Sequence, residues 1–180
     1  MTCIVAVRDE DGSLWMGGDA MVSGVNADLL ANPKVVKKGD WLLGLAGDCS
    51  EAQVIFHLFT PPPVPRGCGI DTYLMTTFLP ALREAQSKCK AGKGTIGLLI
   101  AGHGKIWLMD SSYAITRSRS PFVATGSGGS VALGAMEATP ELPTRDRILR
   151  ALKAAERWTD SVRRPFTIKR LAATGGHSRS

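Results

Sequence analysis

Two short apolar runs open the chain, with a polar turn between them. The first, Thr2–Arg8, is rich in strand-forming residues, and the second, Ser13–Gly18, is apolar again. The turn at Asp9–Gly12 ends in Asp-Gly, which is a strong signal for a β-hairpin when it lies between apolar runs. We therefore predict a hairpin that begins at residue 2, so that this end of the chain is fixed in the structure.

Beyond the hairpin, the apolar pattern predicts a second strand pair and then a helix. Lys34–Lys38 and Trp41–Leu45 are expected to pair around a Gly-Asp turn. Asp48–Leu58 then has the pattern of a helix, with Asp48 or Ser50 as its cap.

A proline-rich stretch separates this helix from the next. Thr60–Gly67 contains four prolines, which exclude a helix or a central strand. We interpret it as a stiff connector, with a proline-rich ligand segment as the alternative. Asp71 is expected to cap a second helix that runs to about Lys88.

The second half of the chain repeats the order of strands followed by a helix pair. Three or four short strands are predicted at Thr95–Ala101, Lys105–Met109, Tyr113–Ile115 and Phe122–Ala124. Two helices follow at Ser127–Ala138 and Thr144–Arg157, and a final strand at Phe166–Lys169. We assign residues 1–171 to a single domain and expect the small, polar tail at 172–180 to be disordered.

Runs of strands separated by helix pairs limit the choice of fold. A doubly wound parallel sheet needs strict alternation of strands and helices, which this chain lacks. The order fits two antiparallel sheets stacked face to face, with a helix pair over each outer side. We therefore predict an α+β protein with a four-layer α-β-β-α sandwich.

Composition and charge change this picture little. The chain is 44% hydrophobic and 21% charged, and no apolar run approaches the roughly 20 residues that span a bilayer. The net charge of +6 raises the question of nucleic-acid binding, but no recognisable nucleic-acid motif accompanies it. We expect a solvated basic face, with neither a nucleic-acid nor a membrane partner.

The four cysteines form no Cys-x-x-Cys pair and lie near no histidine at zinc spacing. We therefore expect no metal site and no cofactor. The first residues lack the basic region and long apolar core of a signal peptide, which predicts a cytoplasmic protein with reduced thiols.

Thr2 is the first candidate for chemistry. A threonine hydroxyl is a poor nucleophile at neutral pH and needs a base within hydrogen-bond reach. Met1 precedes a small residue, so its removal by a methionine aminopeptidase is expected. The free α-amine of Thr2, with an ordinary pKa of about 7.7–8.0, then supplies the base. A Met-Thr start is weak evidence alone, because an ordinary strand also begins this way.

Four further positions strengthen this candidate. Asp19 places a carboxylate just past the end of the hairpin, and Lys34 places an ammonium at the start of the next strand. Gly47 ends a strand immediately before a helix, where a backbone N–H can face an oxyanion. Ser127 lies in a second strand-to-helix glycine segment and adds a hydroxyl.

Together these positions resemble the proteasome β-subunit and HslV-type family of N-terminal-nucleophile threonine peptidases. The resemblance is carried, in order, by Thr2-Cys3-Ile4-Val5, Gly18-Asp19, Lys34, Ala46-Gly47 and Gly126-Ser127-Gly128-Gly129. It is colinear over Thr2–Ile168, and five such features in this order are highly specific.

The resemblance implies a role for each residue. Thr2 Oγ would attack the scissile carbonyl, and its own amine would take the proton through a water. Lys34 would lower the pKa of hydroxyl and amine, and Asp19 would orient Lys34 and keep it charged. The Gly47 N–H would bind the oxyanion, and Ser127 would bind the amine. The alternatives are an ordinary surface pair for Asp19 and Lys34, and a helix N-cap for Ser127.

The same resemblance assigns supporting residues. The family usually has an aspartate followed by a hydroxyl residue near the end of its last helix. Asp160 and Ser161 are the candidates here, at a spacing that departs from the family pattern, and Gly128 is a further supporting residue.

The primary specificity pocket is also assigned by resemblance. Val22, Val36 and Leu45 are expected to line it, and Ser23 is expected to bind the substrate backbone. An apolar pocket favours an apolar residue before the cut. The alternative is that these residues are ordinary core positions, since apolar residues on strand faces are usually buried in the core.

As a whole, the resemblance implies an endopeptidase that acts on peptides or unfolded proteins, assembles into a homo-oligomeric ring and works with an ATPase unfoldase. Three alternatives stay open: a non-proteolytic amidase of the same superfamily, a catalytically silent ring subunit, and a basic nucleic-acid-binding module. Two other glycine motifs lack their structural context, because Val131 replaces the third glycine of a dinucleotide fingerprint and a strand follows the phosphate-loop-like Lys90–Thr95.

Overall fold

The first of two antiparallel sheets contains both ends of the fold. In order of neighbours it consists of β10 (Phe122–Thr125), β1 (Ile4–Arg8), β2 (Leu14–Gly18) and β11 (Thr167–Leu171).

The structure is a computed structural model and describes residues 2–22, 28–29, 33–88 and 96–173. Most of the predicted tail at 172–180, from residue 174 on, therefore lies outside the described residues.

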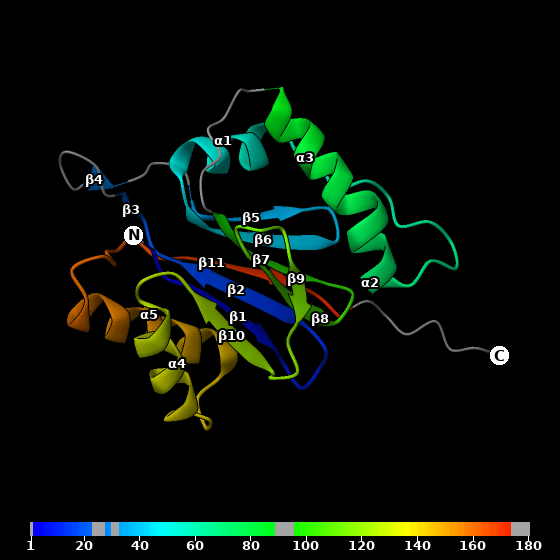
Figure 1. Ribbon diagram of the computed structural model, residues 1–180. Helices are drawn as coiled ribbons and strands as arrows, with labels where there is room; N and C mark the ends of the chain where they lie inside the picture. The colour runs from blue at the N-terminus through cyan, green and yellow to red at the C-terminus, as the bar shows by residue number, and fades with distance from the viewer. Residues whose placement is uncertain (1, 23–27, 30–32, 89–95, 174–180) are drawn as a thin grey trace.

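The second sheet lies face to face with the first (Figure 1). Its neighbours in order are β5 (Val35–Lys38), β6 (Trp41–Gly47), β7 (Ile96–Gly102), β8 (Lys105–Met109) and β9 (Ile115–Arg117). A separate two-stranded ribbon joins β3 (Met21–Val22) to β4 (Asp28–Leu29).

Helices cover the outer side of each sheet (Figure 1). Over the five-stranded sheet lie α1 (Cys49–His57), α2 (Ile70–Tyr73), a π-helical turn (Leu74–Phe78) and α3 (Leu79–Ser87). Over the four-stranded sheet lie α4 (Gly129–Glu137) and α5 (Thr144–Trp158). The predicted α+β four-layer sandwich is confirmed.

The alternation of side chains along the strands divides the core between the layers. On β1, Val5 and Val7 pack under α4 and α5, whereas Ile4 and Ala6 face the other sheet. The core between the sheets consists of Ile4, Ala6, Leu14, Met16, Val35, Leu42, Leu99, Ala101, Ile106 and Leu171. Since β1 is covered on both faces, its sequence is apolar at consecutive positions and does not alternate with polar residues.

The predicted cap of the first helix is confirmed. Asp48 is the N-cap of α1, and its Oδ1 accepts a hydrogen bond from the Ser50 N–H at 2.7 Å.

The prediction that Asp71 caps the second helix is wrong. Gly69 is the N-cap of α2, and no side chain forms a capping hydrogen bond there. The Asp71 carboxylate turns to the sheet, where Oδ1 accepts from Trp107 Nε1 at 2.8 Å and Oδ2 lies 3.1 Å from Arg117 Nη1. A buried indole N–H needs a partner, and this need prevails over the local capping preference.

The strand predicted at Tyr113–Ile115 begins later, at Ile115. Asp110 Oδ1 accepts hydrogen bonds from the backbone N–H groups of Ser112 and Ala114, so this stretch is a turn, and Tyr113 has a φ of 66°.

Candidate active site

Thr2 is placed by the first strand. Ile4 and Ala6 point between the two sheets, and Thr2 continues the same two-residue period toward the end of the sandwich. Thr2 is 4% exposed. Its hydroxyl therefore lies in the inner layer, at the edge where β1 begins.

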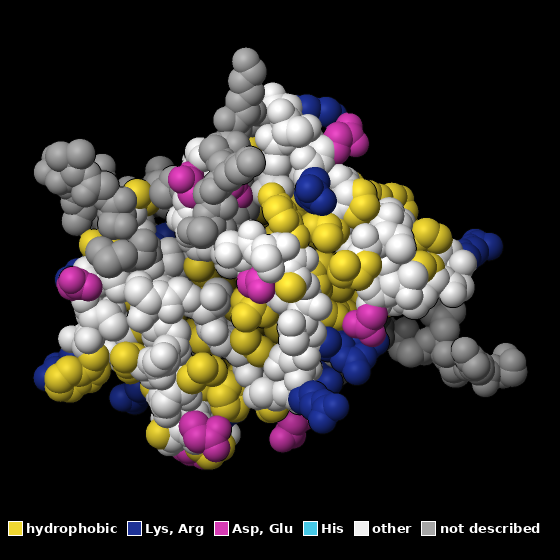
Figure 2. Space-filling model, in the orientation of Figure 1, with side chains coloured by type: hydrophobic (Ala, Val, Ile, Leu, Met, Phe, Trp, Pro, Cys, Tyr) yellow, Lys and Arg dark blue, Asp and Glu magenta, His cyan; other side chains and the backbone are white. Residues whose placement is uncertain are grey.

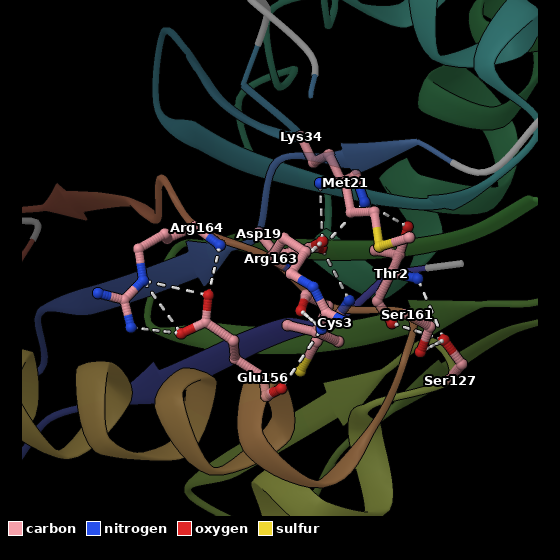
Figure 3. Close-up of polar contacts among 11 residues, drawn as sticks. Thr2, Cys3, Asp19, Met21, Lys34, Ser127, Glu156, Ser161, Arg163 and Arg164 are labelled. Atoms are coloured by element: carbon pink, nitrogen blue, oxygen red, sulfur yellow. Dashed lines mark hydrogen bonds and ion pairs between the residues drawn. The ribbon is translucent and has the colours of Figure 1, made fainter. Parts of the chain in front are cut away.

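Lys34 connects Thr2 to Asp19. The Lys34 Nζ donates to Thr2 Oγ1 at 2.8 Å and to Asp19 Oδ1 at 2.9 Å (Figure 3). Lys34 comes just before β5 and Asp19 just after β2, so the contact joins the two sheets. Their side chains are 7% and 0% exposed, so the alternative of an ordinary surface pair is wrong.

Asp19 is held by backbone donors as well as by Lys34. Its Oδ1 accepts from the Cys3 N–H at 3.0 Å, and its Oδ2 accepts from the N–H groups of Met21 at 2.9 Å and Arg163 at 3.4 Å. Every partner that the described residues give Asp19 is a donor, which suits an ionised carboxylate, because that group only accepts. The carboxylate therefore has a fixed orientation toward Lys34.

Ser127 and Ser161 lie on the other side of Thr2. The Thr2 nitrogen donates to Ser127 Oγ at 3.2 Å, and Ser127 Oγ lies 2.8 Å from Ser161 Oγ. The Gly128 N–H donates to the Thr2 carbonyl at 3.2 Å. Ser161 is 1% exposed, whereas Ser127 is exposed, so this chain of hydroxyls runs from the protein interior toward the surface.

The interpretation of Ser127 as a helix cap is wrong. The N-cap of α4 is Gly128, and no side chain caps that helix. The Ser127 hydroxyl is directed at Thr2 instead (Figure 3).

Gly126 makes the close approach of these segments sterically feasible. Its φ is 90°, a conformation that side-chain-bearing residues rarely adopt. A Cβ at this position would overlap the Thr2 carbonyl. The glycine before Ser127 thus lets two backbones meet at the candidate nucleophile.

Gly47 lies at the same edge as Lys34. The Leu45 N–H donates to the Lys34 carbonyl at 3.0 Å, and β6 ends two residues further on, at Gly47. Gly47 is exposed and has a φ of 138°, which would strain any other residue.

The structure separates the two candidates after α5. Ser161 reaches Ser127, as described above. Asp160 is exposed and makes no hydrogen bond to Thr2, Ser127 or Ser161 in the part of the chain that the structure describes.

The four predicted pocket residues lie in different surroundings. Leu45 is 3% exposed and belongs to the core between the five-stranded sheet and its helices, and Val36 is half-buried against that core. Val22 is half-buried in β3. Ser23 lies outside the described residues.

Sequence reasoning missed the backbone donors to Asp19. The Met21 N–H, two residues after the carboxylate, follows a common local pattern of aspartate and could have been expected. Arg163 is 144 residues away, and nothing in the sequence marks its backbone N–H as part of the site.

Cys3 is a thiol beside the site that does not take part in it. Burial, and then the nearby Asp19 charge, raise the pKa of Cys3 to about 12, so the thiol stays protonated at neutral pH. Its side chain packs under α4 and α5, while its backbone N–H holds Asp19.

Among the described residues, no group of three or more His, Cys, Asp or Glu side chains could hold a metal ion. Within the same residues, every helix is too short or too polar to cross a bilayer.

The chain thus consists of two antiparallel sheets between helix layers, with a buried threonine at the start of the first strand. The sequence matches no family model. Solved structures nevertheless share this fold with the chain over nearly its whole length.

Three of these structures illustrate the likeness. BPH of Thiobacillus denitrificans, solved in complex with epoxomicin, has a TM-score of 0.78 at 21% identity, and the match covers 96% of this chain and 100% of that one. HslV from Trypanosoma brucei has a TM-score of 0.69 at 16% identity, with 95% and 99% covered. Anbu, an ancestral β-subunit from Yersinia bercovieri, has a TM-score of 0.68 at 12% identity, with 95% and 82% covered.

Proposed function

We propose that this chain is a threonine endopeptidase whose nucleophile is Thr2 after removal of Met1. The observation that carries the proposal is the contact of 2.8 Å between the Lys34 ammonium and the Thr2 hydroxyl in a buried setting. A nearby positive charge favours the ionised form of a nucleophile, and burial strengthens that effect.

In the proposed reaction, Thr2 Oγ attacks the carbonyl carbon of a peptide bond, and the hydroxyl proton passes to the α-amine of Thr2. The Gly47 N–H stabilises the oxyanion that forms. Collapse of this intermediate breaks the C–N bond and returns the proton to the leaving nitrogen. Water then hydrolyses the ester on Thr2 and regenerates the free hydroxyl.

The proposed base is supported by the surroundings of the Thr2 nitrogen. This nitrogen becomes the α-amine when Met1 is removed, and its donation to Ser127 Oγ orients it beside the hydroxyl that it must deprotonate. Ser161 in turn fixes Ser127. Asp19 and Lys34 act on the hydroxyl from the opposite side.

The substrate class and assembly are also proposals. Val36 lies on β5, which begins next to Lys34, and Leu45 lies on β6, which ends at Gly47. Together with Val22 they are the proposed pocket for an apolar residue before the cleaved bond. The complex of BPH with epoxomicin supports the use of that compound as a probe of Thr2. We further propose a homo-oligomeric ring in the cytoplasm that receives unfolded protein from an ATPase partner.

Hydrolysis of short fluorogenic peptides tests the proposal. Thr2→Ala is expected to lower kcat by at least about a thousand-fold, because removal of a nucleophile abolishes the covalent route. Thr76→Ala is the matched control, since Thr76 is exposed on the π-helical turn and its hydroxyl donates to the Thr72 carbonyl. Equal turnover by wild type and Thr2→Ala would refute the assignment.

The mass of the amino-terminal peptide completes the test. A wild-type chain that lacks Met1 and cleaves peptides supports the proposal. Retained Met1 together with no hydrolysis would indicate a silent subunit, since an acylated nitrogen is no base. Turnover of simple amides without peptide cleavage would indicate an amidase.

A further inference from the structure

The segment that joins α5 to β11 touches both sides of the candidate site. Ser161 binds Ser127, which binds the Thr2 nitrogen. Two residues later, the Arg163 N–H reaches Asp19 Oδ2, and the Arg163 carbonyl accepts from the Ala20 N–H at 3.0 Å. A displacement of this short segment would therefore disturb both Ser127, which binds the Thr2 nitrogen, and Asp19, which binds Lys34.

The Arg163 guanidinium ties this segment to the end of α5. Its Nη1 donates to the carbonyls of Val162 at 2.7 Å, Thr159 at 3.1 Å and Glu156 at 3.4 Å. The last carbonyls of a helix have no partner within the helix, so a guanidinium here satisfies groups that otherwise need water.

Arg164 adds a second link to the same turn of helix. Its backbone N–H donates to Glu156 Oε1 at 2.9 Å, Nε lies 3.1 Å from both carboxylate oxygens, and Nη2 lies 2.7 Å from Oε2 (Figure 3). These contacts lower the pKa of Glu156, so the pair is charged at neutral pH. A bidentate contact between a guanidinium and a carboxylate fixes the orientation of the two groups as well as the distance between them.

The segment is also anchored by packing. Val162 lies between the arginine and Ser161 in sequence, is fully buried, and belongs to the core under α4 and α5. A Cβ on Gly128 would come within 2.7 Å of Val162 Cγ2, so the glycine at the start of α4 makes room for it. Hydrophobic packing thus sets the depth of the segment, and the two arginines set its position along α5.

We infer that Glu156, Arg163 and Arg164 are positioning residues that hold Ser161 and the Arg163 backbone against Ser127 and Asp19. The inference rests on the proposed function. The three residues act through the hydrogen bonds of this segment, and none touches Thr2 in the described structure. Because the reactive geometry tolerates little misplacement, loosening the segment slows the chemical step more than it weakens peptide binding.

Peptide hydrolysis by Arg164→Ala, Glu156→Gln and Arg164→Lys, in the full chain, tests this inference. Active sites are counted by titration with epoxomicin, so that kcat refers to folded, reactive sites alone. Arg164→Ala and Glu156→Gln are expected to lower kcat per site about ten-fold, with KM changed less than about two-fold. Arg164→Lys, which keeps the charge and loses the fork, is expected to recover part of the rate.

Arg170→Ala is the matched control, because Arg170 on β11 also forms an arginine–carboxylate pair, with Asp11 at 3.0 Å, away from Ser161. If kcat per site in Arg164→Ala equals that in Arg170→Ala while wild type is active, the positioning role is overturned. A fall in thermal stability with an unchanged kcat per site would also overturn it. If wild type neither cleaves peptides nor reacts with epoxomicin, the proposed function fails first, and the inference falls with it.

Discussion

At the scale of single residues, the candidate site depends on one glycine that carries no chemistry. Gly126 lies where a Cβ would overlap the Thr2 carbonyl, and its φ of 90° excludes most other residues. The neighbouring Gly128 gives its N–H to that same carbonyl. Gly126 therefore leaves space for the Thr2 backbone, and Gly128 donates the hydrogen bond that holds it.

Substitution of Gly126 by alanine tests this dependence. Gly126→Ala is expected to cost at least about 2 kcal/mol of unfolding free energy, from left-handed backbone strain and the clash with Thr2, and to abolish peptide hydrolysis. Urea denaturation and a peptidase assay measure the two effects.

Gly134→Ala is the control within the same region. Gly134 lies inside α4, and a Cβ there meets nothing within 4 Å. The substitution is expected to stabilise the protein by up to about 1 kcal/mol, because alanine favours helices. If Gly126→Ala kept wild-type stability and activity, the steric account of this glycine would be incorrect.

At the scale of elements, Asp71 links a helix to the edge of the five-stranded sheet. It lies in the first turn of α2, and its carboxylate binds Trp107 on β8 and Arg117 on β9. Lys105 lies 3.7 Å from the same carboxylate. The helix layer is thus joined to two strands by one side chain as well as by apolar packing.

Asp71→Ala is expected to destabilise the protein by about 1–3 kcal/mol, because it leaves the Trp107 indole N–H buried without its acceptor. Asp146→Ala is the comparison, since Asp146 is exposed in the first turn of α5 and lies 3.9 Å from Arg145. That variant should change stability by less than about 0.5 kcal/mol. Chemical denaturation measures both, and equal losses would contradict the role of Asp71.

Long apolar or amphipathic segments were predictable from the sequence, whereas short ones were not. The first hairpin, α1 and α5 follow from runs of residues with a clear period and from turn or cap residues. The ribbon of β3 and β4 has two residues in each strand, too few for any period. The start of β9 was missed because the Asp110 turn holds the backbone for two residues longer than the apolar pattern indicates.

The candidate site shows the same limit. Thr2, Asp19, Lys34 and Ser127 could be named because side-chain chemistry and family resemblance both mark them. Arg163 contributes a backbone N–H, and because almost every residue has one, the residue type cannot identify this contact. Long-range pairing of that kind depends on where α5 ends, and helix ends are the least certain part of a sequence-based assignment.

At the scale of the whole molecule, large apolar side chains remain exposed on both helix layers. Leu58 is 54% exposed beside α1, Met75 is 50% exposed on the π-helical turn, and Trp158 is 72% exposed at the end of α5. Figure 2 shows apolar side chains reaching the surface on the side that it presents. Burial of such groups between copies would favour assembly.

Light scattering coupled to size-exclusion chromatography tests the proposed oligomer. We expect a mass several times the 19.2 kDa of one chain at micromolar concentration. A mass of a single chain across the concentration range would contradict the assembly.

The course of the first sheet has a practical consequence for recombinant production. Leu171, the last residue of β11, pairs with Leu14 of β2, and Leu14 also pairs with Arg8 of β1. Arg8 is at the end of β1 that is far from Thr2. The end of β11 is therefore about 13 Å or more from the nitrogen of Thr2. A purification handle fused after β11 leaves that nitrogen free. If Thr2 is the nucleophile as proposed, the same handle fused before Thr2 converts that nitrogen to an amide and silences the protein until a protease trims the fusion to the threonine itself.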